Sequence, residues 1–167
     1  MIRLAKIEDS SRMAEINVFG WRCAYKHFIS LEYLFKDFTV KNREKKFIEI
    51  LSIENNPGKT YVFEENNIIK ACMTIGNCND KDKNEKTFEL RAIYVDPLFQ
   101  RQNIGRKLLN FCFEEAINKK KEKITLWVFE KNEESIKFYE KMGFFANGKE
   151  KMHEKLKENE IRMIKKI

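Results

Sequence analysis

One stretch of the chain, residues 87–129, constrains the fold more than any other. Thr87–Val95 predicts a β-strand whose two faces are both largely apolar, which is typical of a central strand covered on each side. Residues 104–118 carry apolar side chains at every fourth position, so they predict a helix with one buried face. Residues 123–129 alternate in the pattern of a strand. A strand, a helix and a strand in this order predict a parallel crossover.

The segments before this stretch predict helices followed by a hairpin. Asp9-Ser10-Ser11 offers capping side chains for the first helix. The expected elements are, in order, a strand over residues 2–5, the capped helix, helical segments over 29–38 and 40–51, hairpin strands over 60–64 and 68–76, and a polar loop over 77–86.

The segments after this stretch predict one more helix and a final pair of strands. Asn132 can cap the helix, and Gly143 lies just past its end. Residues 144–167 predict two antiparallel strands. The side chains expected to point inward are Ile161, Met163 and Ile167.

Composition favours one packed domain over residues 1–167. Hydrophobic residues make up 43% and aromatic residues 13% of the chain, which argues against disorder despite the 35% charged fraction. No apolar run reaches the length of a signal peptide or a membrane span, so we expect a cytoplasmic protein without a membrane partner. The four cysteines lack a C-x-x-C pair, so we expect reduced, mostly buried thiols and no metal site.

The net charge of +7 would suit an anionic partner, either a nucleic acid or a phosphorylated cofactor. Lysines alternate with acidic residues in segments such as 149–151 and 154–158, which favours a solvated face of mixed charge. The sequence contains no recognised nucleic-acid reader motif, so we expect no nucleic-acid partner. A basic nucleic-acid-binding domain is the weakest of the alternatives.

A short loop between the central strand and the long helix predicts an anion site. The strand ends before Asp96-Pro97, and the helix begins close to Gly105. Unpaired N–H groups at a helix N-terminus attract phosphate, and Arg101, Arg106 and Lys107 add positive charge around the same turn. The turn therefore suits a diphosphate, although a purely structural loop explains the same residues equally well.

Three motifs in this region resemble those of the GNAT superfamily of N-acetyltransferases. The segment Gln100-Arg101-Gln102-Asn103-Ile104-Gly105 resembles the family's acetyl-CoA loop, usually Q/R-x-x-G-x-G/A. Residues 93–97 look like its central strand and the exit from that strand, and residues 132–144 are similar to its second motif. The motifs stand in the family's order and spacing. Asn103 replaces the first loop glycine, and it is the residue type that best tolerates a left-handed backbone after glycine.

The resemblance implies a fold, a cofactor and a reaction. The fold would be α/β of the α+β GNAT type, with a mixed, mostly antiparallel sheet of about seven strands, helices on both faces and a parallel strand-helix-strand cofactor unit. Acetyl-CoA would donate its acetyl group directly to a primary amine in a ternary complex. The residues expected to bind the cofactor are Ile93, Tyr94, Val95, Gln100, Arg101, Gln102, Asn103, Ile104, Gly105, Arg106, Lys107, Asn132, Ser135 and Tyr139.

Two side chains are the expected catalytic residues. By the family pattern, Tyr139 would donate its phenolic proton to the departing thiolate, and a backbone N–H of residues 93–95 would polarise the thioester carbonyl. Glu89 is an acid on an otherwise apolar strand, so it is the candidate base for the amine proton. Each has an alternative, because Tyr139 could be a core aromatic and Glu89 could simply pair with Arg91. Asn132 could likewise be only a helix cap.

The acceptor is expected to be a small-molecule amine or a peptide N-terminus, and a homodimer agrees with the family resemblance. Trp21, Tyr25, Phe28 and residues near His153 could line the acceptor site, but helically spaced aromatics are more often core, so none is assigned. A catalytically silent acyl-CoA-binding regulator is the alternative function, and the substitution at Asn103 gives it some support.

Overall fold

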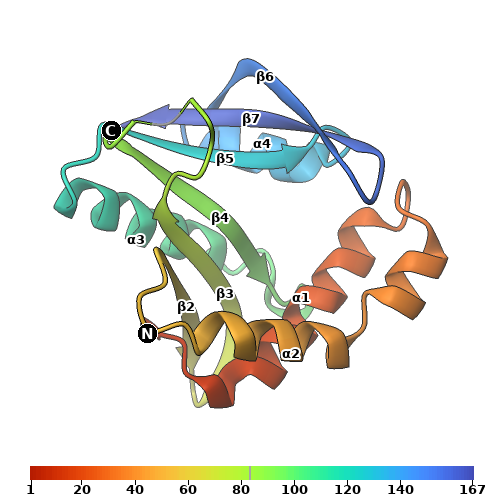
Figure 1. Ribbon diagram of the computed structural model, residues 1–167. Coiled ribbons are helices and arrows are strands. Elements are labelled where there is room, and N and C mark those ends of the chain that lie inside the picture. Colours follow the sequence, from red (N-terminus) through yellow and green to blue (C-terminus); the bar gives the residue numbers. More distant parts are fainter. Residues whose placement is uncertain (83) are drawn as a thin grey trace. The chain divides into compact units, whose positions relative to one another are not determined.

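The computed structural model describes residues 1–82 and 84–167 (Figure 1). Lys83, inside the polar loop predicted over residues 77–86, lies outside the described residues. The chain forms two compact units. The N-terminal unit comprises Met1–Thr74 and Ala92–Leu108, and the C-terminal unit comprises Ile75–Arg91 and Leu109–Ile167. A single domain over the whole chain stays a prediction.

Seven strands form one mixed sheet in the order β1-β2-β3-β4-β5-β7-β6. Strands β4 and β5 pair in parallel, while β1 with β2, β5 with β7 and β6 with β7 pair antiparallel. The predicted mixed, mostly antiparallel sheet and its parallel crossover are therefore confirmed. The strands are β1 Ile2–Leu4, β2 Gly58–Glu65, β3 Ile68–Asn77, β4 Thr87–Val95, β5 Lys123–Phe129, β6 Phe145–His153 and β7 Glu158–Lys166.

The helices fall where periodicity and caps were strongest. The long helix α3 and strand β5 have the predicted bounds, and α4 begins directly after Asn132, whose side chain accepts a hydrogen bond from the Ser135 N–H. The helical segments are η1 Ile7–Asp9, α1 Ser10–Tyr25, η2 Tyr33–Asp37, α2 Val40–Leu51, η3 Pro97–Phe99, α3 Ile104–Asn118 and α4 Glu133–Lys141.

In the N-terminal unit, α1 and α2 pack side by side (Figure 1). Apolar residues on one face of α1 meet Phe47 of α2 and side chains of β2 and β3 in a shared core. Thr39 caps α2, because its hydroxyl accepts a hydrogen bond from the Asn42 N–H at 3.3 Å. The core cluster contains Met13, Ala14, Ile16, Phe47, Val62 and Cys72.

One expectation for the N-terminal unit is wrong. Asp9 makes no side-chain cap on α1. Its carboxylate instead accepts hydrogen bonds from the Arg3 guanidinium at 2.7 and 3.0 Å and from the Lys6 N–H at 2.7 Å, so these two upstream partners occupy the oxygens that would have capped α1. Within the predicted helical segment of residues 29–38, residues 31–37 are helical, and Tyr33–Asp37 form a π-helix. The ring of Phe38 stacks on Trp21 with centroids 4.1 Å apart, which fixes the end of that turn.

In the C-terminal unit, β5 is buried along most of its length, with Ile124, Thr125 and Leu126 at most 2% exposed. Met163 of β7 is buried as predicted and Ile161 is half-buried. Ile167 is not an inward residue, because it lies past the end of β7 and is 37% exposed. Strand β6 is mostly exposed and shifts register between Ala146 and Glu150.

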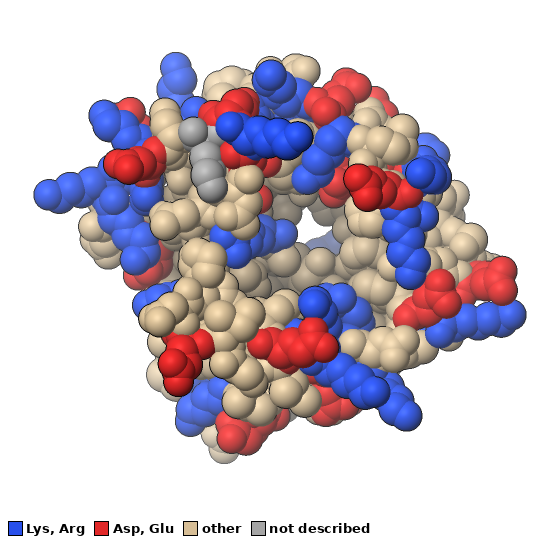
Figure 2. Space-filling view, viewed as in Figure 1, with Lys and Arg blue, Asp and Glu red and all other residues tan. Residues whose placement is uncertain are grey.

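Surface and thiol chemistry agree with the expectations from composition. Figure 2 shows lysine and arginine side chains interspersed with aspartate and glutamate on the visible face, without a continuous basic stripe there. All four cysteines are free thiols, and Cys72, Cys78 and Cys112 are buried while Cys23 is exposed. Within the described part of the chain, no helix is both long and apolar enough to cross a bilayer.

Candidate active site

The exit of β4 in the N-terminal unit is fixed by a buried carboxylate. Asp96 is 4% exposed, and its side chain accepts hydrogen bonds from the Leu98 N–H at 2.8 Å and from the guanidinium of Arg12 on α1. Its own N–H donates to the carbonyl of Lys70 on β3 at 2.9 Å. These bonds hold the end of β4 to two neighbouring elements. In the sequence, Asp96-Pro97 indicates only a strand exit, and no pattern indicates the Arg12 partner, 84 residues away.

The loop after this exit has an unusual backbone. Arg101 and Asn103 both adopt left-handed conformations, with φ of 60° and 61°. Asparagine tolerates this region better than most residues, so the left-handed backbone at Asn103 agrees with the expectation that asparagine can replace the usual glycine. Ile104 then anchors the start of α3, because its side chain is only 3% exposed. Only one residue separates these two left-handed residues, and together they turn the chain sharply into the helix.

The start of α3 presents groups that bind anions. The first N–H groups of a helix have no acceptor within the helix, and they lie at the positive end of its dipole. Arg101, Arg106 and Lys107 are exposed around the same turn, and the Lys107 ammonium lies 5.3 Å from the centre of the Phe63 ring. Oriented amides together with mobile cations fit the diphosphate of coenzyme A. Gln100 and Gln102 are exposed beside them, and Gly105 is half-buried.

The end of β4 supplies backbone rather than side-chain chemistry. Ile93, Tyr94 and Val95 are half-buried. The hydroxyl of Tyr94 accepts a hydrogen bond from Trp21 Nε1 at 3.3 Å, and burial raises the pKa of this phenol. The Tyr94 side chain therefore has a structural partner in α1, and the backbone of this segment is what remains for a ligand.

Glu89 lies in the C-terminal unit and is buried, with 8% exposure. One carboxylate oxygen accepts a hydrogen bond from the Asn79 N–H at 3.2 Å and lies 3.5 Å from Nε of Arg91. Burial raises the pKa of Glu89, while the Asn79 amide and the Arg91 charge oppose that rise. Glu89 therefore contacts Arg91, as expected, and still has a raised pKa. The contact with Arg91 does not exclude a role for Glu89 as a base.

The other two candidate groups of the C-terminal unit belong to α4. Tyr139 is 9% exposed, and its ring packs against Phe138 and Phe144 with centroid distances of 5.5 and 5.8 Å. Asn132 caps the helix through the Ser135 N–H at 3.3 Å. A reverse turn closes at Gly143, whose φ of 86° suits glycine. Tyr139 is thus held rigidly by the core, as a proton donor would need to be.

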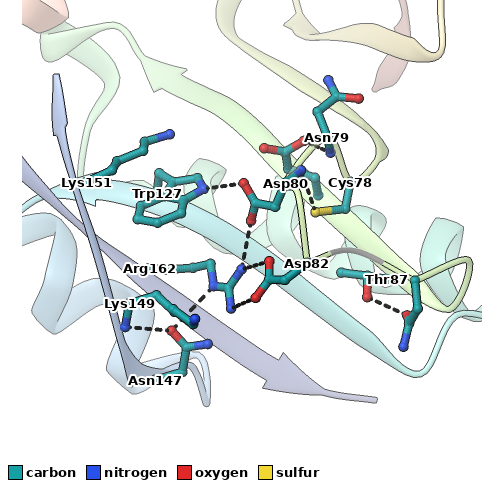
Figure 3. A network of polar contacts seen from close by, with 12 residues as sticks. Cys78, Asn79, Asp80, Asp82, Thr87, Trp127, Asn147, Lys149, Lys151 and Arg162 are labelled. Carbon is teal, nitrogen blue, oxygen red and sulfur yellow. Dashed lines mark hydrogen bonds and ion pairs between the residues drawn. The ribbon is translucent and has the colours of Figure 1, made fainter. Parts of the chain in front are cut away.

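A polar network that the sequence does not predict lies in the loop between β3 and β4. Arg162 of β7 binds Asp80 and Asp82, and Asp80 also accepts a hydrogen bond from Trp127 Nε1 at 2.9 Å (Figure 3). The only sequence signal is an acidic loop, because the arginine lies 80 residues farther along the chain. The two units thus hold different candidates. The N-terminal unit contains residues 93–107, and the C-terminal unit contains Glu89, Asn132, Ser135 and Tyr139.

Comparison with known proteins identifies the family. Residues 22–144 match the acetyltransferase (GNAT) family. The chain is 28% identical over 143 residues to the uncharacterized N-acetyltransferase YuaI of Bacillus subtilis (strain 168), over 83% of this chain and 76% of that protein. The chain therefore belongs to the GNAT family of acetyltransferases, as the motifs predicted.

Solved structures share the fold. PaiA N-acetyltransferase from Thermoplasma acidophilum, in complex with coenzyme A, superposes with a TM-score of 0.79 at 21% identity, over 100% of this chain and 98% of that one. Ribosomal-protein-alanine N-acetyltransferase from Brucella melitensis superposes with a TM-score of 0.73 at 20% identity, over 100% and 99% of the two chains. At these identities the likeness confirms the predicted α+β fold.

Proposed function

We propose that this chain transfers the acetyl group of acetyl-CoA directly to a primary amine, without an acetylated enzyme intermediate. The observation that carries the proposal is the loop of residues 100–105, with its two left-handed residues directly before the buried start of α3. Such a turn aims several N–H groups at one point. The coenzyme A in the related PaiA structure supports the assignment of this ligand.

Residues 93–107 would hold the coenzyme. Backbone N–H groups of residues 101–106 would bind the diphosphate, and the exposed Arg101, Arg106 and Lys107 would add charge without a fixed geometry. The backbone of Ile93–Val95 would align the pantetheine arm and donate an N–H to the thioester carbonyl. In the C-terminal unit, Asn132 and Ser135 would add contacts at the start of α4. When bound, acetyl-CoA supplies an activated acetyl group and a thiolate leaving group.

Glu89 would act as the base. A primary ammonium has a pKa of about 10.4, so it must lose a proton before it can attack. A buried carboxylate with a raised pKa is a better acceptor for that proton than an exposed one. Thr125 pairs with Glu89 in the β4/β5 register and is 2% exposed, and its hydroxyl has no hydrogen-bond partner among the described residues. A water held by both groups would relay the proton and satisfy that hydroxyl.

Tyr139 would act as the acid. The thiol of the product has a pKa of about 8.5, so the departing sulfur is a better leaving group when it is protonated. A phenol with a pKa of about 10 can donate a proton to it as the carbon–sulfur bond breaks. The packing of Tyr139 against Phe138 and Phe144 supports this role by restricting its ring. The acceptor would be a small amine or a peptide N-terminus.

The experiment is acetyl transfer measured by thiol release across a panel of small amines and peptides, with the acetylated product identified by mass spectrometry. We expect turnover on at least one acceptor. Glu89→Gln should lower kcat about 100-fold, because a general base contributes at least that factor. Glu134→Gln, at an exposed position of α4, is the matched control and should leave kcat unchanged. Thermal stabilisation by coenzyme A without turnover on any acceptor would favour the silent acyl-CoA-binding regulator instead.

A further inference from the structure

Arg162 fastens the loop between β3 and β4 to the sheet. Its guanidinium donates to both carboxylate oxygens of Asp82 at 2.6 and 2.8 Å, and to Asp80 at 3.1 Å. Nε of Arg162 also donates to the Asn147 side chain of β6 at 3.4 Å. Figure 3 shows Arg162 at the centre of these carboxylates and the amide. A bidentate arginine–carboxylate pair fixes direction as well as distance, so the Asp82 side chain is held in one orientation.

Strand β5 provides a second attachment for the same loop. Trp127 Nε1 donates to Asp80 at 2.9 Å, on the oxygen that Arg162 does not contact. Both oxygens of Asp80 are thereby engaged, and its side chain is 15% exposed. The Asp80 N–H also contacts the sulfur of Cys78 at 3.5 Å. Asp80 is therefore held at both its backbone and its side chain.

The residue next to this attachment contacts the candidate base. Asn79 precedes Asp80, and its N–H donates to the Glu89 carboxylate at 3.2 Å. Because one peptide bond separates the two residues, the bonds that hold Asp80 also aim the Asn79 amide. The chain of contacts thus runs from Arg162 through Asp80 and Asn79 to Glu89.

We propose that Arg162 is a positioning residue that, through Asp80 and Asp82, holds the Asn79 amide on the carboxylate of Glu89. This inference rests on the proposed function, in which Glu89 is the base. Arg162 acts through the loop and does not touch the substrate. Through these contacts, Arg162 influences the pKa and the orientation of the Glu89 carboxylate.

The charges around Glu89 give the direction of the effect. Cys78 and Asp80 face it from the loop, Arg91 from its own strand, and Lys151 from β6. The Asn79 hydrogen bond lowers the pKa of Glu89, and the Asp80 charge raises it. Removing Arg162 would weaken the hydrogen bond from the Asn79 N–H to Glu89. It would also remove the positive charge that pairs with Asp80. Both changes raise the pKa of Glu89 in the variant, so they add rather than cancel.

The test is the pH dependence of kcat at saturating acetyl-CoA and acceptor for Arg162→Ala, Asp82→Asn and a control. We expect the acid limb of Arg162→Ala to move up by about one pH unit, which is about a tenfold loss of kcat on that limb, with rates that converge at high pH. Asp82→Asn should move the limb in the same direction by less, about threefold in rate. Arg162→Lys should show a smaller shift than Arg162→Ala, because lysine keeps the positive charge but cannot make the bidentate contact with Asp82.

The control is Glu122→Gln, which breaks the exposed ion pair of Glu122 with Lys86 in the same unit and should reproduce the wild-type profile. An unchanged acid limb in folded Arg162→Ala, or an equal loss at every pH, would overturn the inference. If Arg162→Ala does not fold, Asp82→Asn decides, because the Asp82 side chain is 50% exposed. If Glu89→Gln keeps both its rate and its acid limb, the base assignment itself is wrong.

Discussion

The guanidinium of Arg12 on α1 binds the carboxylate of Asp96 at the exit of β4. The Asp96 side chain is 5% exposed, and Arg12 also donates to the carbonyl of Ile69 at 3.1 Å. The pair therefore ties the first helix and two strands to the point where the loop of residues 100–105 begins. The proposed anion site depends on this attachment for its position.

The first prediction concerns this ion pair. Arg12→Ala leaves the buried Asp96 carboxylate with its contact to the Leu98 N–H and no cation among the residues that the structure describes. The free energy of unfolding should fall by about 2–3 kcal/mol, less than the usual cost of breaking a fully buried pair because Arg12 is partly exposed. Urea denaturation measures the change. Glu15→Gln removes the exposed second partner of Arg12 and should cost under about 0.5 kcal/mol. Equal losses in the two variants would contradict the structural role of Asp96.

The second prediction concerns the left-handed backbone at Asn103. Asn103→Ala should destabilise the fold by about 1 kcal/mol, because a side chain with no local hydrogen bonding pays the full cost of this conformation. Asn103→Gly should be neutral or stabilising, and it should bind coenzyme A at least as tightly as the wild type. Thermal unfolding and calorimetry measure both effects. Asn110→Ala, an exposed position within α3, is the matched control and should not weaken coenzyme binding.

The third prediction concerns Tyr139. Tyr139→Phe keeps the ring that packs on Phe144, so the fold and the affinity for coenzyme A should be nearly unchanged. Loss of the phenolic proton should lower kcat about 100-fold. Steady-state thiol release and calorimetry on the same preparation separate the two effects. Tyr61→Phe, at another buried tyrosine, should leave kcat within about twofold of the wild type. A wild-type rate in Tyr139→Phe would refute its role as the acid.

The fourth prediction concerns stability in acid. Hydrogen bonds from Arg162 lower the pKa of Asp82 to about 2. A carboxylate whose pKa is depressed in the folded state adds stability above its unfolded value of about 3.9, and this stability disappears as the pH falls toward 2. Asp82→Asn should therefore cost at most about 1 kcal/mol at pH 6, since the group is half exposed, and progressively less as the pH falls through 2. Urea denaturation across this range measures it, and a cost that does not fall with pH would contradict the ion-pair origin.

Local signals predicted the elements that surround the site. The fourfold spacing along α3, the alternation along β5 and the cap at Asn132 each depend on residues close in sequence, and the structure confirms all three. The cap expected at Asp9 failed because Arg3 of β1 competes for the same carboxylate. In the site, too, local sequence patterns predicted the candidate residues but not their tertiary contacts.

Short-range motifs pointed to residues 100–105, to Glu89 and to Tyr139. The bonds that hold the site in place join residues far apart in the sequence. Arg12 with Asp96 and Arg162 with Asp82 are separated by 84 and 80 residues. One sequence contains no pattern that links such partners, because the pairing follows from tertiary packing and not from spacing. The motifs therefore predicted the candidate residues, and only the structure shows the ion pairs that hold them in place.

The central claim is that the turn before α3 binds the anionic part of coenzyme A, and titration calorimetry at low ionic strength tests it most directly. We expect saturable binding that weakens as salt is added and weakens further in Arg106→Glu, while Lys119→Glu, past the far end of α3, binds as the wild type does. Absence of binding heat together with absence of any thermal shift, or binding that is insensitive to Arg106→Glu, would contradict the claim.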